Sequence, residues 1–261
     1  MRQYGIIGNP LGHSWSAQLF NKRFAREGIA AEYALYPLTE LNHSTLDTLV
    51  RTHHLEGFSV TIPYKQTIIP LLDEVTETAR GIGAVNVVKA AWDGDVYRLT
   101  GYNTDYIGFR ESLLPLVREK NCPPKALILG TGGAARAVTY ALSSPWNADG
   151  WKRWNVTMVS RKAQDSIRNI PCVTYGQLTE DIIRQCSLIV NCTPLGMYPE
   201  TDACPPIPYE AVGKGHILYD CIYNPEETLF LRKGRELGAR TQNGMQMLEL
   251  QAQAAWEEWN N

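Results

Sequence analysis

The sequence lacks any apolar run close to the roughly 20 residues that cross a bilayer, so it predicts no membrane-spanning segment. The apolar part of residues 1–8 is too short for a secretory signal peptide, and none is expected. Neither sign of charge dominates, because 25 Lys and Arg stand against 27 Asp and Glu, a net charge of −2. That balance gives no electrostatic reason to expect nucleic acid as a partner.

Signatures of disulfide and metal sites are also missing. The cysteines are dispersed, with no C-x-x-C pair among Cys122, Cys172, Cys186, Cys192, Cys204 and Cys221. The five histidines are scattered as well. This spacing is typical of a protein in a reducing compartment, so we expect a cytoplasmic chain with neither disulfide bonds nor a metal site.

The sequence does contain a regular alternation of strand-like and helix-like stretches, and its 261 residues suit one large or two small domains. The first hundred residues predict strands at 4–7, 33–37, 57–62, 84–91 and 96–100, and helices at 16–28 and 41–50. A helix at 105–120, which Pro115 could interrupt, leads to buried strands at 126–129, 156–159, 188–191 and 217–220. That second series favours a parallel, doubly wound sheet. The amphipathic stretch 245–259 is expected to fold back across the first domain.

Residues 125–136 read as a buried strand, a glycine-rich turn and the start of a helix. A nucleotide pyrophosphate needs this order. Gly130 allows the tight turn, Gly132 lets backbone N–H groups approach the phosphates, and Ala135 lets the helix pack closely on the strand. The helix N-terminus then presents its partial positive charge to the anion. The segment therefore predicts a dinucleotide site.

The end of the next strand indicates which dinucleotide is bound. Enzymes that use NAD usually place Asp or Glu there, to accept a hydrogen bond from the ribose hydroxyl. This chain has Ser160, Arg161 and Lys162 instead. The two cations suit a 2′-phosphate, and Arg161 could also stack on the adenine ring. NADP is favoured over the alternative, a solvated basic turn.

Three upstream clusters each allow two interpretations. Ser14 and Ser16 precede a predicted helix, where hydroxyl and helix N–H donors together could bind a carboxylate, although Ser16 could equally serve only as the helix cap. Lys65 follows an apolar strand and could be an ordinary surface lysine. Asp105 starts a predicted helix and could be its N-cap. From the residues alone, these alternatives stay open.

Taken in order, the motifs resemble those of the shikimate dehydrogenase family, which includes quinate/shikimate dehydrogenases. The upstream motifs are G-x-P-x-x-H-S-x-S at 8–16, V-T-x-P-x-K at 60–65, G-A-x-N at 83–86 and N-T-D-x-x-G at 103–108. The later ones are G-x-G-G-A-x-R at 130–136, N-C-T-P-L-G-M at 191–197, D-C-I-Y-N-P at 220–225 and G-M-Q-M-L at 244–248. The resemblance covers nearly the whole chain.

The resemblance implies two α/β domains with a cleft between them. Residues 1–104 with 244–261 would form an N-terminal substrate-binding domain, and residues 105–243 a Rossmann-like, doubly wound NADP-binding domain. The implied reaction is the reversible, NADP-dependent reduction of 3-dehydroshikimate to shikimate, in aromatic amino acid (chorismate) biosynthesis. The partners would be small molecules, and the chain a monomer or homodimer.

The resemblance also implies roles for individual residues. Lys65 and Asp105 would be the catalytic pair. The implied substrate contacts are Ser14, Ser16, Thr61, Lys65, Asn86, Asp105, Tyr223 and Gln251. The implied cofactor contacts are Gly130, Gly132, Gly133, Ala134, Ser160, Arg161, Lys162, Thr193, Met197, Ile222, Gly244 and Met247.

The chain departs from the family pattern at four positions. Many members have Pro at the place of Ala17, Asn at that of Ser59, Thr at that of Val87, and a small hydroxyl residue at that of Lys162. These departures leave the finer substrate contacts open, though not the reaction. Two functional alternatives remain: a quinate/shikimate dehydrogenase that also accepts NAD, and a non-catalytic, nucleotide-sensing protein.

Overall fold

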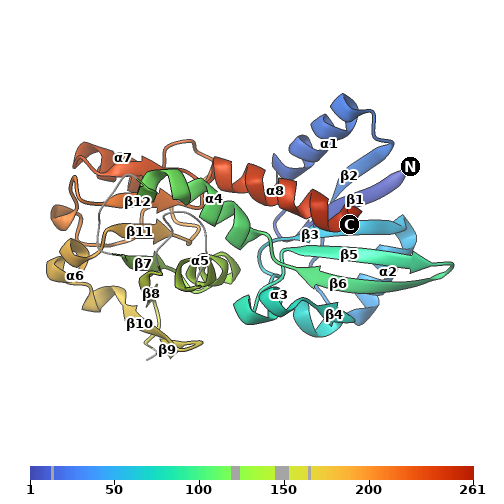
Figure 1. Cartoon of the computed structure of the whole chain (residues 1–261), viewed down its shortest axis with the longest axis horizontal. Coiled ribbons are helices and arrows are strands. Elements are labelled where there is room, and N and C mark those ends of the chain that lie inside the picture. Colours follow the sequence, from blue (N-terminus) through green and yellow to red (C-terminus); the bar gives the residue numbers. More distant parts are fainter. Residues whose placement is uncertain (13–14, 119–123, 145–152, 164–165) are drawn as a thin grey trace. The chain divides into compact units, whose positions relative to one another are not determined.

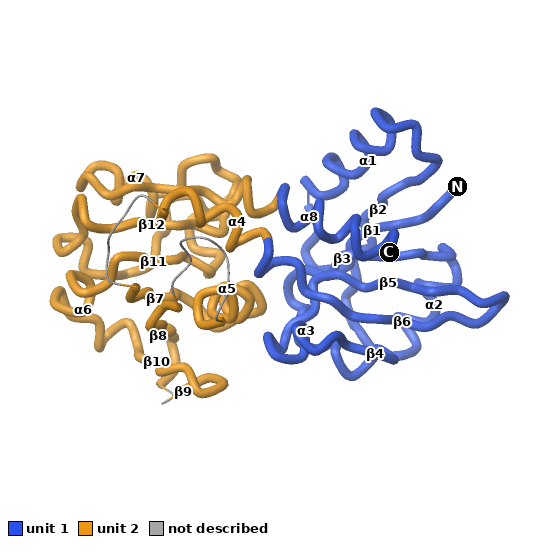
Figure 2. The backbone as a smooth tube through the Cα atoms, in the orientation of Figure 1, with its two compact units in different colours: residues 1–107, 249–261 blue, residues 108–248 orange. Residues whose placement is uncertain are grey.

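The computed structural model describes residues 1–12, 15–118, 124–144, 153–163 and 166–261. Packing divides the chain into two compact units, coloured separately in Figure 2. Unit 1 comprises residues 1–107 and 249–261, and unit 2 comprises residues 108–248. Each unit has its own sheet, which confirms the α/β class predicted from the alternating pattern.

Unit 1 is built on a mixed six-stranded sheet in the order β2-β1-β3-β5-β6-β4 (Figure 1). Strand β1 runs parallel to β2 and β3, whereas β5 runs antiparallel to β3 and β6. The elements are β1 (Arg2–Gly8), α1 (Trp15–Glu27), β2 (Ala31–Pro37), α2 (His43–His53), β3 (Leu55–Val60), β4 (Glu74–Val75), α3 (Glu77–Ile82), β5 (Val87–Asp93) and β6 (Val96–Tyr102). Helices α4 (Asp105–Arg118) and α8 (Met245–Asn260) each belong partly to this unit.

Local sequence explains several of these elements. Helix α1 buries Phe20 and Phe24, which lie four residues apart and therefore on one face. Helix α2 starts at a capping box, in which Asn42 and Thr45 each bond to the other's backbone N–H. The β5–β6 hairpin turns at Gly94, whose φ of +59° lies in the left-handed region that glycine adopts at little cost.

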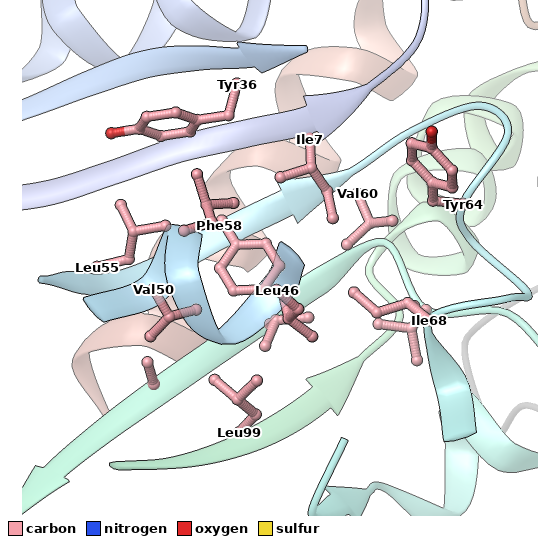
Figure 3. Close-up of a cluster of buried hydrophobic side chains, with 14 of the residues drawn as sticks. Ile7, Tyr36, Leu46, Val50, Leu55, Phe58, Val60, Tyr64, Ile68 and Leu99 are labelled. Carbon is pink, nitrogen blue, oxygen red and sulfur yellow. The ribbon is translucent and has the colours of Figure 1, made fainter. Parts of the chain in front are cut away.

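The main core of unit 1 lies between the sheet and α2 (Figure 3). Strand β3 contributes Leu55 and Phe58, and α2 contributes Leu46 and Val50; none of these side chains is more than 2% exposed. The spacing of four residues on the helix places both of its side chains on the face toward the strand. This core anchors the strand that leads into the site.

The end of α8 packs into unit 1. Trp259 is 3% exposed, its ring centroid lies 5.0 Å from that of Tyr4, and its indole N–H donates to the carbonyl of Val88 at 2.9 Å. The prediction that the C-terminal stretch returns to the first domain is therefore confirmed.

Unit 2 contains a seven-stranded sheet in the order β13-β12-β11-β7-β8-β10-β9. Every pairing is parallel except that of β9 with β10, at the edge. The elements are β7 (Lys125–Leu129), α5 (Gly133–Ser143), β8 (Asn155–Ser160), β9 (Ser166–Ile167), β10 (Ile170–Thr174), α6 (Glu180–Gln185), β11 (Leu188–Asn191), β12 (Ile217–Asp220), α7 (Leu229–Glu236) and β13 (Arg240–Gln242). The four predicted strands form the centre of this sheet.

Helices cover both faces of the unit 2 sheet. Leu218 of β12 belongs to the cluster that contains Ile183 of α6 and Phe230 of α7. Its neighbour Tyr219 points to the opposite face, because side chains alternate along a strand, and its ring meets that of Phe109 of α4 at 4.9 Å. This arrangement is the doubly wound architecture predicted from the sequence.

Helix α4 continues through Pro115 to Arg118, so the expected interruption is absent. Proline lacks the N–H that would bond to the carbonyl four residues earlier. Since only three residues of α4 follow it, the loss falls in the last turn, where helices already fray. Among the described residues, no helix is both long and apolar enough to cross a membrane.

Candidate active site

The predicted substrate residues of unit 1 gather at one edge of its sheet. Strands β1 and β3 are parallel and end at this edge, and the end of β6 meets the start of β5 because Tyr102 pairs with Val87. The segments that enter or leave these strands therefore lie together. Thr61 follows β3, Asn86 precedes β5, and Asp105 opens α4 just after β6.

Lys65 and Asp105 form an ion pair at this edge, although they are 40 positions apart in the sequence. Nζ of Lys65 lies 2.5 Å from Oδ2 of Asp105, and the two side chains are only 17% and 7% exposed. The backbone carbonyl of Lys65 accepts from the N–H of Val85 at 2.7 Å, which holds the lysine segment beside the start of β5. The alternative of an ordinary surface lysine is therefore wrong. Asp105 lies inside α4 as its first residue, so the alternative of an N-cap residue is wrong as well.

The other carboxylate oxygen of Asp105 belongs to a buried amide network. Nδ2 of Asn86 donates to Oδ1 of Asp105 at 2.9 Å, to Oγ1 of Thr104 at 3.0 Å and to Oε1 of Gln251 at 3.2 Å. Oδ1 of Asn86 accepts from the backbone N–H of Thr104 at 2.6 Å, and the Thr104 hydroxyl lies 3.4 Å from Oε1 of Gln251. Asn86 thus connects Asp105 to Gln251 directly, and Thr104, which is fully buried, is bonded to both Asn86 and Gln251.

Thr61 directly follows β3, and Ser16 belongs to α1, the helix that follows β1. Ser16 is the second residue of α1 and is buried, so it is not the cap that precedes the helix. Thr61 packs on the end of β1: a Cβ added to Gly8 would collide with the Thr61 methyl group. Ser14 lies outside the described residues, so its predicted role stays a prediction.

Two of the departures from the family pattern are neighbours in this sheet. Ser59 of β3 pairs with Val87 of β5, and both side chains are buried. Two side chains that face each other across a ladder pack as a pair. Ser59 and Val87 are therefore best treated as one joint change.

In unit 2, the predicted pyrophosphate turn follows β7. Gly130 has φ +109°, and a Cβ there would lie 3.2 Å from Cγ2 of Thr193, so glycine is required. Its N–H donates to the carbonyl of Val159 at 2.9 Å, which ties the turn to the end of β8. Gly132 precedes α5 and caps it without any side-chain hydrogen bond, and a Cβ on Gly132 would meet nothing within 4 Å. Gly133 and Ala134 open the helix, so this end offers backbone N–H groups over open space.

The adenosine-side residues lie at the end of β8, next to this turn. Ser160 is buried, and its hydroxyl oxygen accepts from the N–H of Lys162 at 3.1 Å. Arg161 and Lys162 are both exposed. Since β7 and β8 are parallel neighbours, these two cations share an edge with the glycine turn.

A buried polar network supports the loops after β11 and β12. Asn191 accepts on Oδ1 from the Thr193 hydroxyl at 2.7 Å and donates from Nδ2 to Oδ1 of Asp220 at 3.1 Å. Asp220 also accepts from the N–H of Ile222 at 3.0 Å and from the Thr228 hydroxyl at 2.6 Å. Burial raises the pKa of Asp220 to about 6, against the opposing effect of these donors. The network fixes Thr193 and Ile222 relative to each other.

The remaining predicted residues all lie in unit 2. Gly244 packs directly on the backbone of Cys221, so no larger residue fits there. Met197 is 44% exposed, while Met247 is buried at the start of α8. Tyr223 is half-buried, and burial raises the pKa of its hydroxyl. Its predicted contact with the substrate stays a prediction, since the other substrate residues belong to unit 1.

Sequence reasoning did not single out Thr104, Asn191, Asp220 or Thr228. A usable signal exists for two of them, because Asn191 and Asp220 are polar residues that end otherwise apolar strands. Within the described ranges, no group of three or more His, Cys, Asp or Glu side chains could hold a metal ion.

The chain is similar to known proteins over nearly its whole length. The family model of the shikimate dehydrogenase substrate binding domain matches residues 6–88. A shikimate dehydrogenase (NADP(+)) of Methanococcus maripaludis strain C6 is 35% identical, and the match covers 98% of this chain and 90% of the relative. Its counterpart in Geobacillus kaustophilus is 36% identical, and the match covers 98% of this chain and 91% of that relative.

Solved structures match over nearly the whole chain. A chorismate mutase/shikimate 5-dehydrogenase fusion protein from Clostridium acetobutylicum aligns with a TM-score of 0.82 at 36% identity, covering 99% of this chain and 91% of the other. Shikimate 5-dehydrogenase from Thermus thermophilus, in complex with NADP(H) and shikimate, aligns with a TM-score of 0.80 at 30% identity, covering 99% of this chain and 93% of the other. Quinate dehydrogenase from Corynebacterium glutamicum, in complex with NAD, aligns with a TM-score of 0.82 at 27% identity and with the same coverage of both chains.

Proposed function

This chain belongs to the shikimate dehydrogenase family, and we propose that Lys65 and Asp105 carry out its proton transfer. The enzyme is an NADP-dependent oxidoreductase that acts on a CH–OH group, in the reversible reduction of 3-dehydroshikimate to shikimate. The observation that carries the proposal is the shielded ion pair, with Nζ of Lys65 2.5 Å from Oδ2 of Asp105.

NADPH, when bound, supplies the hydride for the ketone carbon. As the substrate's carbonyl oxygen gains negative charge, Nζ of Lys65 donates the proton that turns it into a hydroxyl. Asp105 holds the ammonium group in place and accepts a hydrogen bond from a neighbouring ring hydroxyl. In the oxidative direction, Lys65 takes the proton back.

The other unit 1 residues orient the ring. Ser16, with Ser14, would bind the substrate carboxylate, because hydroxyl and helix N–H donors suit an anion. Thr61 would lie against the ring and its hydroxyls. Asn86 and Gln251, already joined by a hydrogen bond of 3.2 Å, would bind ring hydroxyls, and Tyr223 would add a further contact from unit 2. Groups held by neighbours in this way bind a ligand without first being ordered.

The residues of unit 2 fit NADP. The open space above Gly132 and the N–H groups of α5, which no side chain caps, suit a pyrophosphate. Gly133 and Ala134 would add backbone contacts there, and Ser160, Arg161 and Lys162 would hold the adenosine 2′-phosphate. The residues nearer the nicotinamide would be Thr193, Met197, Ile222, Gly244 and Met247.

A spectrophotometric assay tests this function. The purified protein is given shikimate or quinate with NADP or NAD, and the appearance of the reduced cofactor is followed. We expect the highest kcat/KM for shikimate with NADP. Comparable turnover of quinate with NAD would instead support the dual-specificity alternative, and tight NADPH binding without any turnover would support a nucleotide sensor.

We further propose that the enzyme works in the cytoplasm as a monomer or homodimer, without nucleic acid. The dispersed cysteines and the net charge of −2 support these assignments. Light scattering on the purified protein, with and without NADP, measures the oligomeric state. A larger assembly would contradict the proposal.

Thr104 should matter for substrate use although the proposal gives it no contact with substrate. Replacing it by valine keeps its shape but removes the hydroxyl that meets Asn86 and Gln251. Since a neutral hydrogen bond contributes about 0.5–1.5 kcal/mol, we expect kcat/KM for shikimate to fall by about 3- to 10-fold. Steady-state kinetics with varied shikimate measures this change.

Two comparisons separate this effect from general damage. The KM for NADP should stay unchanged, because the proposed cofactor residues lie in unit 2. Thr104→Ser, which restores the hydroxyl, should recover most of the activity. If valine and serine variants lose activity equally, the hydroxyl has no positioning role.

A further inference from the structure

Cys192 and Cys221 lie side by side where β11 and β12 end. The preceding residues, Asn191 and Asp220, are register partners, and the N–H of Cys221 donates to the carbonyl of Asn191 at 2.9 Å. Both cysteines therefore leave the sheet at the same level and on the same face. Their sulfur atoms are 3.6 Å apart, and both residues are partly exposed.

This geometry is close to that of a disulfide. Adjacent strands are about 4.8 Å apart, which lies within the Cα separations of about 4.4–6.8 Å that disulfides span. A sulfur–sulfur bond of about 2.05 Å requires an approach of about 1.5 Å from the observed 3.6 Å. Small adjustments of the two loops can supply it.

The other described cysteines of unit 2 are less suited to oxidation. Cys172 and Cys186 are buried, and burial raises the pKa of both thiols, that of Cys186 to about 11. Because the thiolate is the nucleophile, such thiols react slowly. Cys204 is partly exposed, but among the described residues only Cys192 and Cys221 have sulfur atoms in contact.

We propose that Cys192 and Cys221 form a dithiol site that two-electron oxidants such as hydrogen peroxide convert to a disulfide. One thiolate attacks the peroxide oxygen and becomes a sulfenic acid, with hydroxide as the leaving group. The second thiol attacks this sulfur, the disulfide bond forms and water leaves. Overall, two thiols lose two electrons and two protons, and peroxide is reduced to two waters. A dithiol reductant reverses the change.

The two cysteines lie next to Gly130 and Gly244, two of the residues proposed to bind the cofactor. The carbonyl of Cys192 lies 3.3 Å from the position of a Cβ on Gly130, and the backbone of Cys221 packs against Gly244. Thr193 and Ile222 directly follow the two cysteines, so the loop adjustments that bring the sulfur atoms together also displace these two residues. Oxidation should therefore weaken NADP binding and, by thermodynamic linkage, bound NADP should shift the disulfide–dithiol equilibrium toward the dithiol. This consequence rests on the proposed function.

The experiment treats the full-length enzyme with hydrogen peroxide, alkylates the remaining thiols and maps the peptides by mass spectrometry. We expect a peptide pair linked through Cys192 and Cys221 and its reversal by dithiothreitol. When the enzyme is equilibrated in a thiol–disulfide buffer, less of the linked pair should form in the presence of NADP. The oxidised enzyme should bind NADP about 5- to 150-fold more weakly, the usual range of such coupling. Independent alkylation of both cysteines after peroxide treatment, with no linked peptide, would overturn the proposal.

Serine variants of the cysteines test the proposed site in a second way, through NADP binding. Cys192→Ser and Cys221→Ser should each keep NADP binding after peroxide treatment, whereas the matched control Cys204→Ser should lose it as the unchanged enzyme does. Equal loss in all three variants would contradict the proposed site. The reduced enzyme reports separately on the proposed function: if it has no dehydrogenase activity, that function fails whether or not the disulfide forms.

Discussion

Replacing Lys65 by methionine should lower kcat for shikimate oxidation by at least about 10²-fold, because general acid–base catalysis typically contributes 10²- to 10⁴-fold. Methionine has a similar length and no proton to exchange. The loss corresponds to about 3–5 kcal/mol of activation free energy. KM for shikimate should change less, since Ser16, Asn86 and Gln251 remain in place.

In the Lys65→Met variant, the carboxylate of Asp105 loses its positively charged partner. The loss of activity must therefore be distinguished from a loss of the folded state. The carboxylate keeps the hydrogen bond from Asn86 at 2.9 Å, so we expect a folded protein. Thermal unfolding and NADPH binding measured by fluorescence check this, since the proposed cofactor residues lie in unit 2. Lys22→Met, an exposed position on α1, is the matched control and should behave as the unchanged enzyme.

Asp105→Asn extends the test to the pair. If the two residues act as one unit, the double variant should be hardly slower than either single variant, as is usual for catalytic groups that depend on each other. Additive losses would assign them separate roles. A Lys65→Met enzyme with nearly full kcat would remove the lysine from the mechanism.

The parts of the structure that sequence could predict depend on local patterns. The buried strand before Gly130 and the helix after it follow from a short segment, and α1 follows from the spacing of Phe20 and Phe24. The convergence of Lys65 and Asp105 is different in kind, because no local rule joins positions 40 residues apart. That prediction came from the resemblance, and the sheet topology now supplies its physical reason.

What sequence could not predict depends on contacts between distant residues. Gln251 meets Asn86 across 165 positions, and Asp220 meets Asn191 across 29, so local sequence does not show which residues pair. Asn191 and Asp220 stand out locally only as polar residues at the ends of apolar strands. Thr104 looked like an ordinary residue between the two polar members of its motif. Its importance becomes visible only when β5, β6 and α8 are placed together.

Reversing the charge of Arg161 should change the cofactor preference. We expect Arg161→Glu to lower kcat/KM for NADP by about 10²-fold, because a charge-assisted hydrogen bond contributes about 1.5–3 kcal/mol and the new carboxylate also repels the 2′-phosphate. Activity with NAD should hold or improve, since a glutamate at the end of this strand can accept from the ribose hydroxyl. Kinetics with both cofactors at saturating shikimate measure the change.

Arg153→Glu is the matched control, because it makes the same charge change just before β8 begins, whereas Arg161 follows its end. The two variants have equal net charge, so a general effect on the attraction of an anionic cofactor would appear in both. A local effect would appear only in Arg161→Glu, and raising the salt concentration should weaken NADP binding less in this variant than in the unchanged enzyme. Equal losses for NADP and NAD would show that Arg161 supports the loop and does not read the phosphate, and the basic segment after β8 would then be a solvated turn.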